Sequence, residues 1–517
     1  MDPGAAGARA IKRNPRRSVH QLETAVGPLI VKQYHSRGAL DWIKSRLGRG
    51  RAAREWTIAT SLRQAGLPAP EPLCLGVRRV RGEAEFSLLA SRLIPDAEPL
   101  GGFLERQFHS GDGRAPEKSA WLVRAVRLLA RLHEAGFDHR DFHGGNLLVT
   151  LSADPETSLT VIDLHRVSSG RPGRVSNRRR LRALADLLHT LRFTLEPELN
   201  RLAVETYLEA AGWPASRSPI WLRRVERALT KRERRRIRSR TRRCVKFSSE
   251  FEPVRVGGVR GFKRRDVPLH DLFQAVEAAR CEIREGGPRV RSLARRSSVA
   301  LSDCLDFEVA VKTYDQDGAR QSLRGRFTAG RARKAYVAAH GLSVRGVPVP
   351  RVLAWLRTPD RAFLVTEAVS GAVPLSVRSF ELVIGDATRE KEARRVSGAV
   401  AELLIALFRS GVRVNDLSPK NILIGADDRT ARLCDFDGVT LGRRSGRDRM
   451  LRGLAQINDL APAFPASWRA RVFRRVAAAV PEVAGKAGLR EVCRRTKLRA
   501  ARTLGPPAPG SIGAAGS

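Results

Sequence analysis

The sequence predicts an α+β protein with two tandem domains, because one set of elements occurs twice in the same order. In each half, an apolar strand ending in lysine precedes a helical stretch, a D-x-x-x-x-N loop and a short strand carrying an aspartate. From the lysine to the loop aspartate the chain runs 109 residues in the first half and 104 in the second. Short apolar strands mixed with longer helical segments indicate both α and β structure in each copy.

The length and composition allow this organisation. A chain of 517 residues with 42% hydrophobic side chains can bury the cores of two or three ordinary domains, which excludes a disordered protein. The predicted parts are disordered residues 1–14, a first domain at 15–220, a basic linker at 221–244, a second domain at 245–490 and a disordered tail at 491–517.

The chain is strongly basic. Lysine and arginine number 95 against 53 acidic residues, a formal charge of +42, which should attract polyanions. Residues 231–243, KRERRRIRSRTRR, contain nine basic residues and one acid and fit a solvated helical face or linker. No aromatic residue interleaves them, which disfavours nucleic acid as a partner. Peripheral contact with an anionic membrane would explain the charge equally well, and so would genomic base composition.

Cysteine usage and hydropathy predict a cytoplasmic protein, at most peripheral to the inner face of the membrane. The cysteines form no CxxC pair, so reduced thiols are expected rather than disulfides or a structural zinc site. No uncharged apolar segment approaches the length of a membrane span. The six cysteines are Cys74, Cys244, Cys281, Cys304, Cys434 and Cys493.

The first copy contains a set of residues suited to phosphoryl transfer. Lys32 ends the strand LIVKQY, and Glu55 on the next helix could pair with it. Asp141 and Asn146 lie in the loop HRDFHGGNLLV, and Asp163 follows the apolar pair in VIDLHRV. The chemistry needs a carboxylate to accept a hydroxyl proton, an amide and a carboxylate to hold Mg²⁺, and a cation on the phosphates of ATP.

The second copy keeps only part of this set. Lys312, Asp416, Asn421 and Asp435 remain, but Ala335 stands opposite Glu55. We therefore expect this copy to bind nucleotide and metal through Lys312, Asn421 and Asp435 while catalysing poorly through Asp416. The alternative is a second active kinase that uses a different acid.

Further differences and local elements refine this interpretation. Val414 and Asn415 replace His139 and Arg140, and of the two acids in LCDFDGV we favour Asp435 over Asp437 as the metal ligand. FEPVRVGGVRGFKRR predicts a hairpin and LHDLFQAVEAARCEI a helix before the Lys312 strand.

Two features of the first copy fit ordinary loops. His143 and His165 have no cysteine or third histidine at ligand spacing, so we interpret them as polar loop residues rather than a metal site. No G-x-G-x-x-G loop precedes Lys32, and Gly27 marks a plain hairpin turn there.

These motifs resemble the lipopolysaccharide kinase (Kdo/WaaP) family, a branch of the protein-kinase-like superfamily, in two tandem copies. The likeness rests on LIVKQY, GLPAPEPL, HRDFHGGNLLV and VIDLHRV, and on VAVKTY, GVPVPRVL, NDLSPKNILI and LCDFDGV. It implies two bilobal domains, each with a small β-rich lobe carrying the lysine and a larger helical lobe carrying the loop.

The resemblance also implies a function. The family phosphorylates sugars of the lipopolysaccharide core with ATP and Mg²⁺. By this resemblance, Lys32 would hold the phosphates and Glu55 would orient Lys32. Asp141 would act as the base, and Asn146 and Asp163 would bind the metal. The acceptor is then a sugar or glycolipid hydroxyl, phosphorylated mainly by the first domain. A protein Ser/Thr/Tyr kinase and a pseudokinase pair that scaffolds anionic membrane or nucleic acid are the alternatives.

Overall fold

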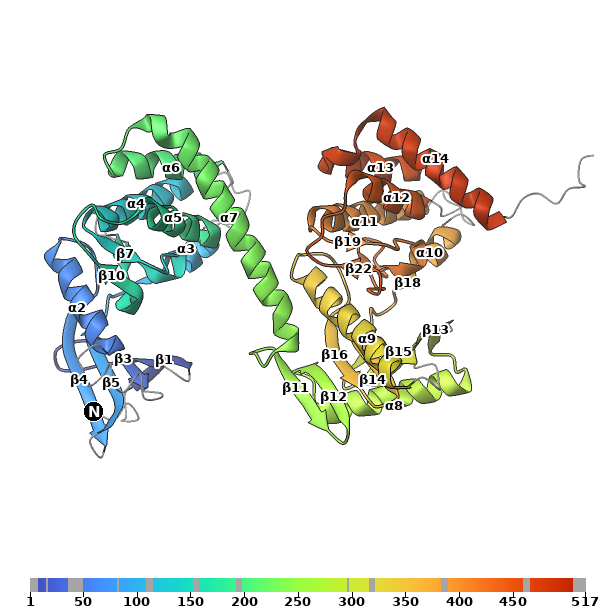
Figure 1. The fold of residues 1–517 in the computed structure, drawn as a ribbon, viewed down its shortest axis with the longest axis horizontal. Helices are drawn as coiled ribbons and strands as arrows, with labels where there is room; N and C mark the ends of the chain where they lie inside the picture. The colour runs from blue at the N-terminus through green and yellow to red at the C-terminus, as the bar shows by residue number, and fades with distance from the viewer. Residues whose placement is uncertain are drawn as a thin grey trace, which may run out of the picture. The chain divides into compact units, whose positions relative to one another are not determined.

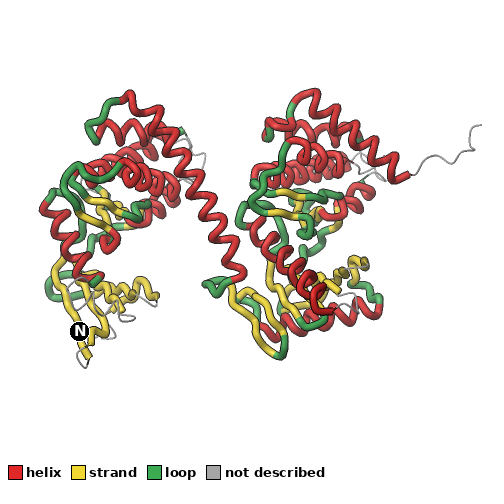
Figure 2. The backbone as a smooth tube through the Cα atoms, in the orientation of Figure 1, coloured by secondary structure: helices red, strands yellow, loops and turns green. Residues whose placement is uncertain are grey.

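The computed structural model divides the chain into two units, Met1–Arg235 (unit 1) and Arg236–Ser517 (unit 2). In each unit most strands gather at one end and most helices at the other (Figures 1 and 2). The structure describes residues 8–14, 17–35, 50–80, 83–107, 115–151, 158–191, 198–294, 297–315, 321–382, 389–458 and 465–504.

Unit 1 begins with a five-stranded antiparallel sheet in the order β1-β2-β3-β5-β4. Its strands are β1 (Ala8–Asn14), β2 (Arg17–Leu22), β3 (Leu29–His35), β4 (Pro72–Val80) and β5 (Glu83–Arg92). The predicted turn at Gly27 is confirmed, and its φ of +96° explains the glycine. The expected disorder of residues 1–14 is wrong for β1, because this segment pairs with β2.

Helix α2 (Arg51–Gln64) packs on this sheet. Its Ala52 is fully buried and lies in one apolar cluster with Tyr34 of β3 and Leu89 of β5. This packing fixes the helix beside the strand that carries Lys32.

The rest of unit 1 is mainly helical. Helix α4 (Ala115–Glu134) repeats apolar residues every three or four positions, and Leu122, Leu129 and Leu132 are buried in the main core. Burying each such side chain stabilises the fold by about 1.5–3 kcal/mol. The other elements are α3 (Leu100–Gln107), α5 (Asn177–Leu191), α6 (Leu199–Ala210), and the short strands β6 (Glu98–Pro99), β7 (Phe137–His139), β8 (Leu147–Val149), β9 (Leu159–Val161) and β10 (Val167–Ser169).

The basic linker predicted at 221–244 is largely a continuous helix, α7 (Ser218–Thr241). Trp221 and Val225 on its first turns are buried in the core of unit 1. The linker was predicted from the basic residues at 231–243, whereas the buried side chains of Trp221 and Val225 attach the start of this helix to unit 1.

The sheet of unit 2 has seven strands in the order β11-β12-β16-β17-β15-β14-β13. The part β13-β14-β15-β17-β16 follows the same order as the whole sheet of unit 1. The predicted hairpin is confirmed as β11–β12, whose turn residues Gly257 and Gly258 both have positive φ. The strands are β11 (Phe251–Val256), β12 (Val259–Arg264), β13 (Val290–Ala294), β14 (Ser297–Cys304), β15 (Phe307–Asp315), β16 (Val352–Arg357) and β17 (Arg361–Glu367).

The predicted helix before the Lys312 strand is confirmed as α8 (Leu269–Glu285), and α9 (Gln321–Ser343) takes the place of α2 in the element order. The predicted disordered tail at 491–517 starts inside helix α14, where Val492 is buried; residues 1–7 and 505–517 lie outside the described residues. The remaining elements are α10 (Leu375–Glu381), α11 (Arg389–Arg409), α12 (Arg447–Asn458), α13 (Ala466–Ala479), α14 (Gly485–Leu504), β18 (Val373–Pro374), β19 (Arg413–Val414), β20 (Ile422–Ile424), β21 (Ala431–Leu433) and β22 (Val439–Thr440).

Within the described residues, no helix is both long enough and apolar enough to cross a lipid bilayer.

Candidate active site

The first part of the site joins strand β3 to helix α2. Lys32 and Tyr34 are two residues apart on β3, so their side chains leave the same face of the sheet. The Lys32 ammonium and the Tyr34 hydroxyl each donate to one carboxylate oxygen of Glu55, which is only 2% exposed. The structure thus brings Lys32 and Glu55 together and adds Tyr34, which the sequence reasoning did not single out.

The charge on Glu55 depends on its partners. Burial alone would raise the pKa of this carboxyl, but the Lys32 ammonium and the Tyr34 hydroxyl hold it below its usual value. Burial raises the pKa of Tyr34, so the phenol remains a donor. Removing either member of a buried ion pair leaves the other charge uncompensated, so this pair should act as a unit.

The second part of the site is the loop between β7 and β8. The His139 ring accepts from the Asp141 backbone N–H at Nδ1 (3.2 Å) and donates from Nε2 to the Ile162 carbonyl oxygen (3.1 Å). Burial lowers the pKa of His139, which favours the neutral ring that this pattern needs. The Asn146 amide donates to the Asp141 carbonyl oxygen at 2.9 Å, which leaves Asn146 Oδ1 as the atom available to a ligand.

The third part is Asp163, directly beyond β9. The Ile162 N–H donates to the Asn146 carbonyl oxygen at 2.9 Å, so the two candidate metal ligands come from adjacent strands. Asp163 has left-handed φ and ψ angles of 63° and 45°, a conformation that short polar side chains tolerate. Its carboxylate pairs with Arg17 of β2 and lies 2.9 Å from His165 Nδ1. Burial alone would raise the pKa of Asp163, but His165 and Arg17 lower it far below its ordinary value.

Asp141 is the accessible acid of the site. Its side chain is 29% exposed, against 3% for Glu55. Arg166 Nη1 lies 3.1 Å from Asp141 Oδ2, and His143 Nε2 lies 3.9 Å from the same oxygen. A substrate hydroxyl can therefore approach Asp141 but not Glu55.

Two glycines allow the loop to pack in this way. Gly136, which ends α4 with φ of +86°, approaches so closely that a Cβ would lie 2.5 Å from the Gly170 carbonyl oxygen. A Cβ at Gly144 would lie 2.7 Å from Leu191 Cδ2. Both contacts are shorter than a Cβ allows, so glycine lets the chain approach the Gly170 backbone at one position and Leu191 of α5 at the other.

The residues present fit a magnesium ion. Mg²⁺ takes oxygen ligands, commonly one or two carboxylates together with waters and substrate phosphates. Asp163 and Asn146 Oδ1 offer such oxygens. One ligand atom each from Glu55, Asp163 and His165 also lie within 4.8 Å of one another. Lys32 and Tyr34 bind both carboxylate oxygens of Glu55, whereas Arg17 and His165 both contact Oδ1 of Asp163. Asp163 Oδ2 together with Asn146 Oδ1 therefore fits the ion better than Glu55 does.

Sequence reasoning missed two side chains that contact the Asp163 carboxylate. Arg17 pairs with Asp163, and it faces Tyr34 across the β2–β3 ladder. His165 was interpreted as a polar loop residue, yet its ring contacts the Asp163 carboxylate. Hairpin register was the signal that could have found Arg17, because it brings this residue next to the strand that carries Lys32.

In unit 2 the lysine contacts two acids. Lys312 Nζ lies 2.9 Å from Asp435 Oδ1 and 3.2 Å from Asp437 Oδ2. The Tyr314 hydroxyl donates to Asp437 at 2.8 Å, and Arg331 pairs with the same carboxylate at 3.1 Å. Burial favours a neutral amine, but the two carboxylates raise the pKa of Lys312. Ala335 stands opposite Glu55, but Asp435 and Asp437 from another segment supply acids to Lys312.

The loop of unit 2 differs from that of unit 1. The Ser418 N–H donates to Asp416 Oδ1 at 3.0 Å, and the Asn421 amide donates to Oδ2 at 3.1 Å. Val414 in the place of His139 has no ring nitrogen to bond the loop. Both oxygens of the Asp416 carboxylate are thus engaged within the loop itself.

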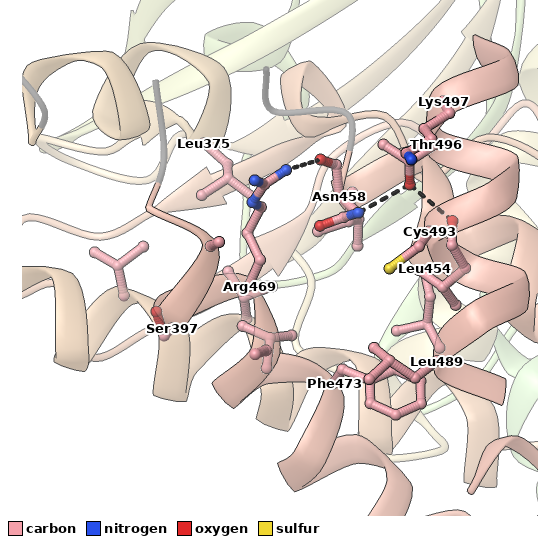
Figure 3. Close-up of a pocket in the computed structure, with 17 residues that line it drawn as sticks. Leu375, Ser397, Leu454, Asn458, Arg469, Phe473, Leu489, Cys493, Thr496 and Lys497 are labelled. Carbon is pink, nitrogen blue, oxygen red and sulfur yellow. Dashed lines mark hydrogen bonds between the residues drawn. The ribbon is translucent and has the colours of Figure 1, made fainter. Parts of the chain in front are cut away.

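Unit 2 also has a cavity of about 410 Å³, lined by residues of helices α10, α11, α12, α13 and α14 (Figure 3). Apolar side chains such as Leu454, Phe473 and Leu489 form much of its wall, together with Ser397 and Arg469. None of the predicted site residues of unit 2 lines this cavity. It is therefore separate from the Lys312 cluster.

A buried histidine should make unit 1 sensitive to acid. His133 Nδ1 lies 2.7 Å from the Tyr207 hydroxyl, and burial lowers the pKa of His133 to about 3. The unfolded chain binds this proton below about pH 6.5, so the stability present at pH 7 falls as the pH drops from 6.5 toward 3. When the pH falls from 7 to 5, we expect the free energy of unfolding of the wild type to fall by about 2 kcal/mol more than that of His133→Gln, which lacks this titrating group. Hydrogen exchange of α4 at the two pH values measures both losses, and equal losses would contradict the expectation.

The chain is similar in sequence to known proteins. Residues 10–203 match the family model of the lipopolysaccharide kinase (Kdo/WaaP) family. The 3-deoxy-D-manno-octulosonic acid kinase of Stenotrophomonas maltophilia (strain R551-3) is 26% identical over 148 residues, covering 27% of this chain and 55% of that protein. The chain thus spans about half the length of this relative.

A solved structure described as WaaP in complex with acyl carrier protein also matches. It has 21% identity and a TM-score of 0.33, and the match covers 43% of this chain and 88% of that one. This similarity is too low to add to the assignment. The sequence comparisons support a kinase: residues 10–203 are similar to the lipopolysaccharide kinases of the Kdo/WaaP family, and the matching relative is a kinase.

Proposed function

We propose that unit 1 transfers the γ-phosphoryl group of ATP, with Mg²⁺, to a hydroxyl of a sugar or glycolipid such as the lipopolysaccharide core. The observation that carries this proposal is the proximity of the Lys32–Glu55 pair to Asp163, since ligand atoms of Glu55 and Asp163 lie within 4.8 Å. Asn146 lies beside both loop acids, because its amide bonds the Asp141 carbonyl oxygen and its own carbonyl oxygen accepts from Ile162, the residue before Asp163. The match of residues 10–203 to the Kdo/WaaP family supports the sugar acceptor.

Each residue has one role in the proposed mechanism. Lys32 binds the phosphates and Glu55 holds its ammonium in position. Asp141 accepts the proton of the acceptor hydroxyl. The hydroxyl oxygen bonds to the γ-phosphorus as the bond between that phosphorus and the ADP oxygen breaks. Asn146 and Asp163 would hold Mg²⁺, which neutralises charge on the phosphates.

Three further side chains support these roles. His139 sets the backbone of Asp141, because its ring bonds both the loop and the strand before Asp163. Arg17 and His165 keep the Asp163 carboxylate ionised, the form a metal requires. They are positioning residues.

We also propose that the two units are related domains, the second divergent. The shared strand order of their main sheets supports this, and so do the small three-stranded sheets β6-β8-β9 and β18-β20-β21, which present the loop asparagine and the following aspartate in the same way. In both units the residue before that aspartate donates its N–H to the asparagine carbonyl oxygen.

The acceptor class can be tested directly. The full chain would be incubated with γ-labelled ATP, Mg²⁺ and either lipopolysaccharide core oligosaccharide or a mixture of proteins. We expect label on the oligosaccharide, released by treatment with phosphomonoesterase. Label on protein alone would favour the protein-kinase alternative, and no transfer to either would favour a scaffold.

A further inference from the structure

The helix of unit 2 has lost the acid that orients the lysine in unit 1. Ala335 on α9 occupies the place that Glu55 has on α2, at the same distance in sequence from the strand lysine. It is 1% exposed, as Glu55 is 2% exposed, so the position points inward in both units. A methyl group there cannot bind an ammonium.

Asp437 makes the contacts that Glu55 makes in unit 1. One Glu55 carboxylate bridges Lys32 and Tyr34, and one Asp437 carboxylate bridges Lys312 and Tyr314. In each unit the lysine and the tyrosine are two residues apart on the same strand, so the acid binds the same pair of donors.

The acid now comes from a different segment. Asp437 follows Asp435 by two residues, as His165 follows Asp163. The helix of unit 2 supplies a cation in place of the acid, because Arg331 on α9 pairs with Asp437 at 3.1 Å. The carboxylate has moved from the helix to the loop, while its position beside the lysine is retained.

We infer that unit 2 is a second binding site for a magnesium–nucleoside triphosphate complex, in which Asp437 replaces the helix glutamate. The Lys312 ammonium would take the phosphates, and Asp435 with Asn421 would take the metal. Transfer is assigned to unit 1, where the His139 ring positions Asp141, because Val414 stands in the place of that ring in unit 2. The ligand class rests on the proposed function of unit 1.

The number of bound nucleotides tests this inference. Isothermal titration of the full chain with the non-hydrolysable analogue AMP-PNP and Mg²⁺ should give two sites per chain. Asp163→Ala should leave one, and Asp163→Ala with Asp435→Ala should leave none. One site in the wild type that disappears in Asp163→Ala would overturn the inference and leave the proposed function of unit 1 intact. No binding at all would contradict both.

The role of Asp437 is tested in the Asp163→Ala background, where only the second site remains. Asp437→Asn should weaken AMP-PNP binding by at least about 10-fold, since the lysine loses its orienting charge. Asp303→Asn removes the same charge from an exposed residue paired with Arg289 and should change nothing. An unchanged affinity in Asp437→Asn would overturn the assignment.

A rescue variant separates positioning from folding. Ala335→Glu combined with Asp437→His recreates in unit 2 the helix acid and loop histidine of unit 1. It should restore most of the affinity that Asp437→Asn loses, whereas a merely structural role for Asp437 predicts no recovery. Thermal melting of each variant confirms that the comparison is made on folded protein. If a variant does not fold, the number of AMP-PNP sites in the wild type still tests the inference.

Discussion

Asp141→Asn is expected to lower the rate of phosphate transfer by roughly 10²–10⁴-fold while nucleotide affinity stays close to that of the wild type. Asparagine keeps the size of the side chain, but it cannot accept the proton of the acceptor hydroxyl. Asp141 is the accessible acid of the site, and its backbone contacts to His139 and Asn146 do not depend on the carboxylate. The change should therefore fall on turnover rather than on binding.

Single-turnover transfer and AMP-PNP titration measure the two effects separately. Glu209→Gln is the matched control, because it removes one negative charge from an exposed position on α6 of the same unit. Transfer at the wild-type rate in Asp141→Asn would exclude Asp141 as the base.

Asp163→Ala is expected to abolish the magnesium-dependent part of nucleotide binding in unit 1, a loss of at least about 100-fold in affinity. The substitution removes the carboxylate that would hold the ion and leaves Arg17 without this partner. Asn146 alone offers one neutral oxygen, which is too little to hold Mg²⁺ against water.

The measurement is AMP-PNP binding with and without Mg²⁺ in a chain that also carries Asp435→Ala, so that unit 2 does not contribute. The control is Glu205→Ala, an exposed position on α6. Equal magnesium dependence in Asp163→Ala and in the control would show that the metal ligands lie elsewhere.

The sequence predicted the parts of the site that sit at fixed spacing. The pairing of Lys32 with Glu55 follows from a strand lysine and a buried helix acid, and the loop follows from the order of Asp141, Asn146 and Asp163. The hairpin at Gly257 and helix α8 were likewise predicted, because turn glycines and apolar periodicity are local signals.

What the sequence did not reveal depends on tertiary register. Arg17 reaches Asp163 only because β2 lies beside β3, and Asp437 reaches Lys312 only because of how the chain turns after Asp435. The aligned alanine at 335 therefore indicated a missing acid, although a different segment supplies one.

Two boundaries failed for a related reason. Strand β1 is rich in charge and lacks an apolar pattern, yet it gains backbone hydrogen bonds from β2. The basic residues at 231–243 predicted a linker where the structure has helix α7. Trp221 and Val225 attach the first turns of this helix to a core built from distant segments. Local composition cannot report such partners.

The most direct test of the account compares the two loop aspartates in the full chain. Transfer from γ-labelled ATP to lipopolysaccharide core oligosaccharide would be measured for Asp141→Asn and Asp416→Asn side by side. The account predicts that Asp141→Asn loses nearly all transfer, and that Asp416→Asn keeps transfer close to the wild-type rate. Transfer that survives in Asp141→Asn but disappears in Asp416→Asn would contradict it and assign the reaction to unit 2.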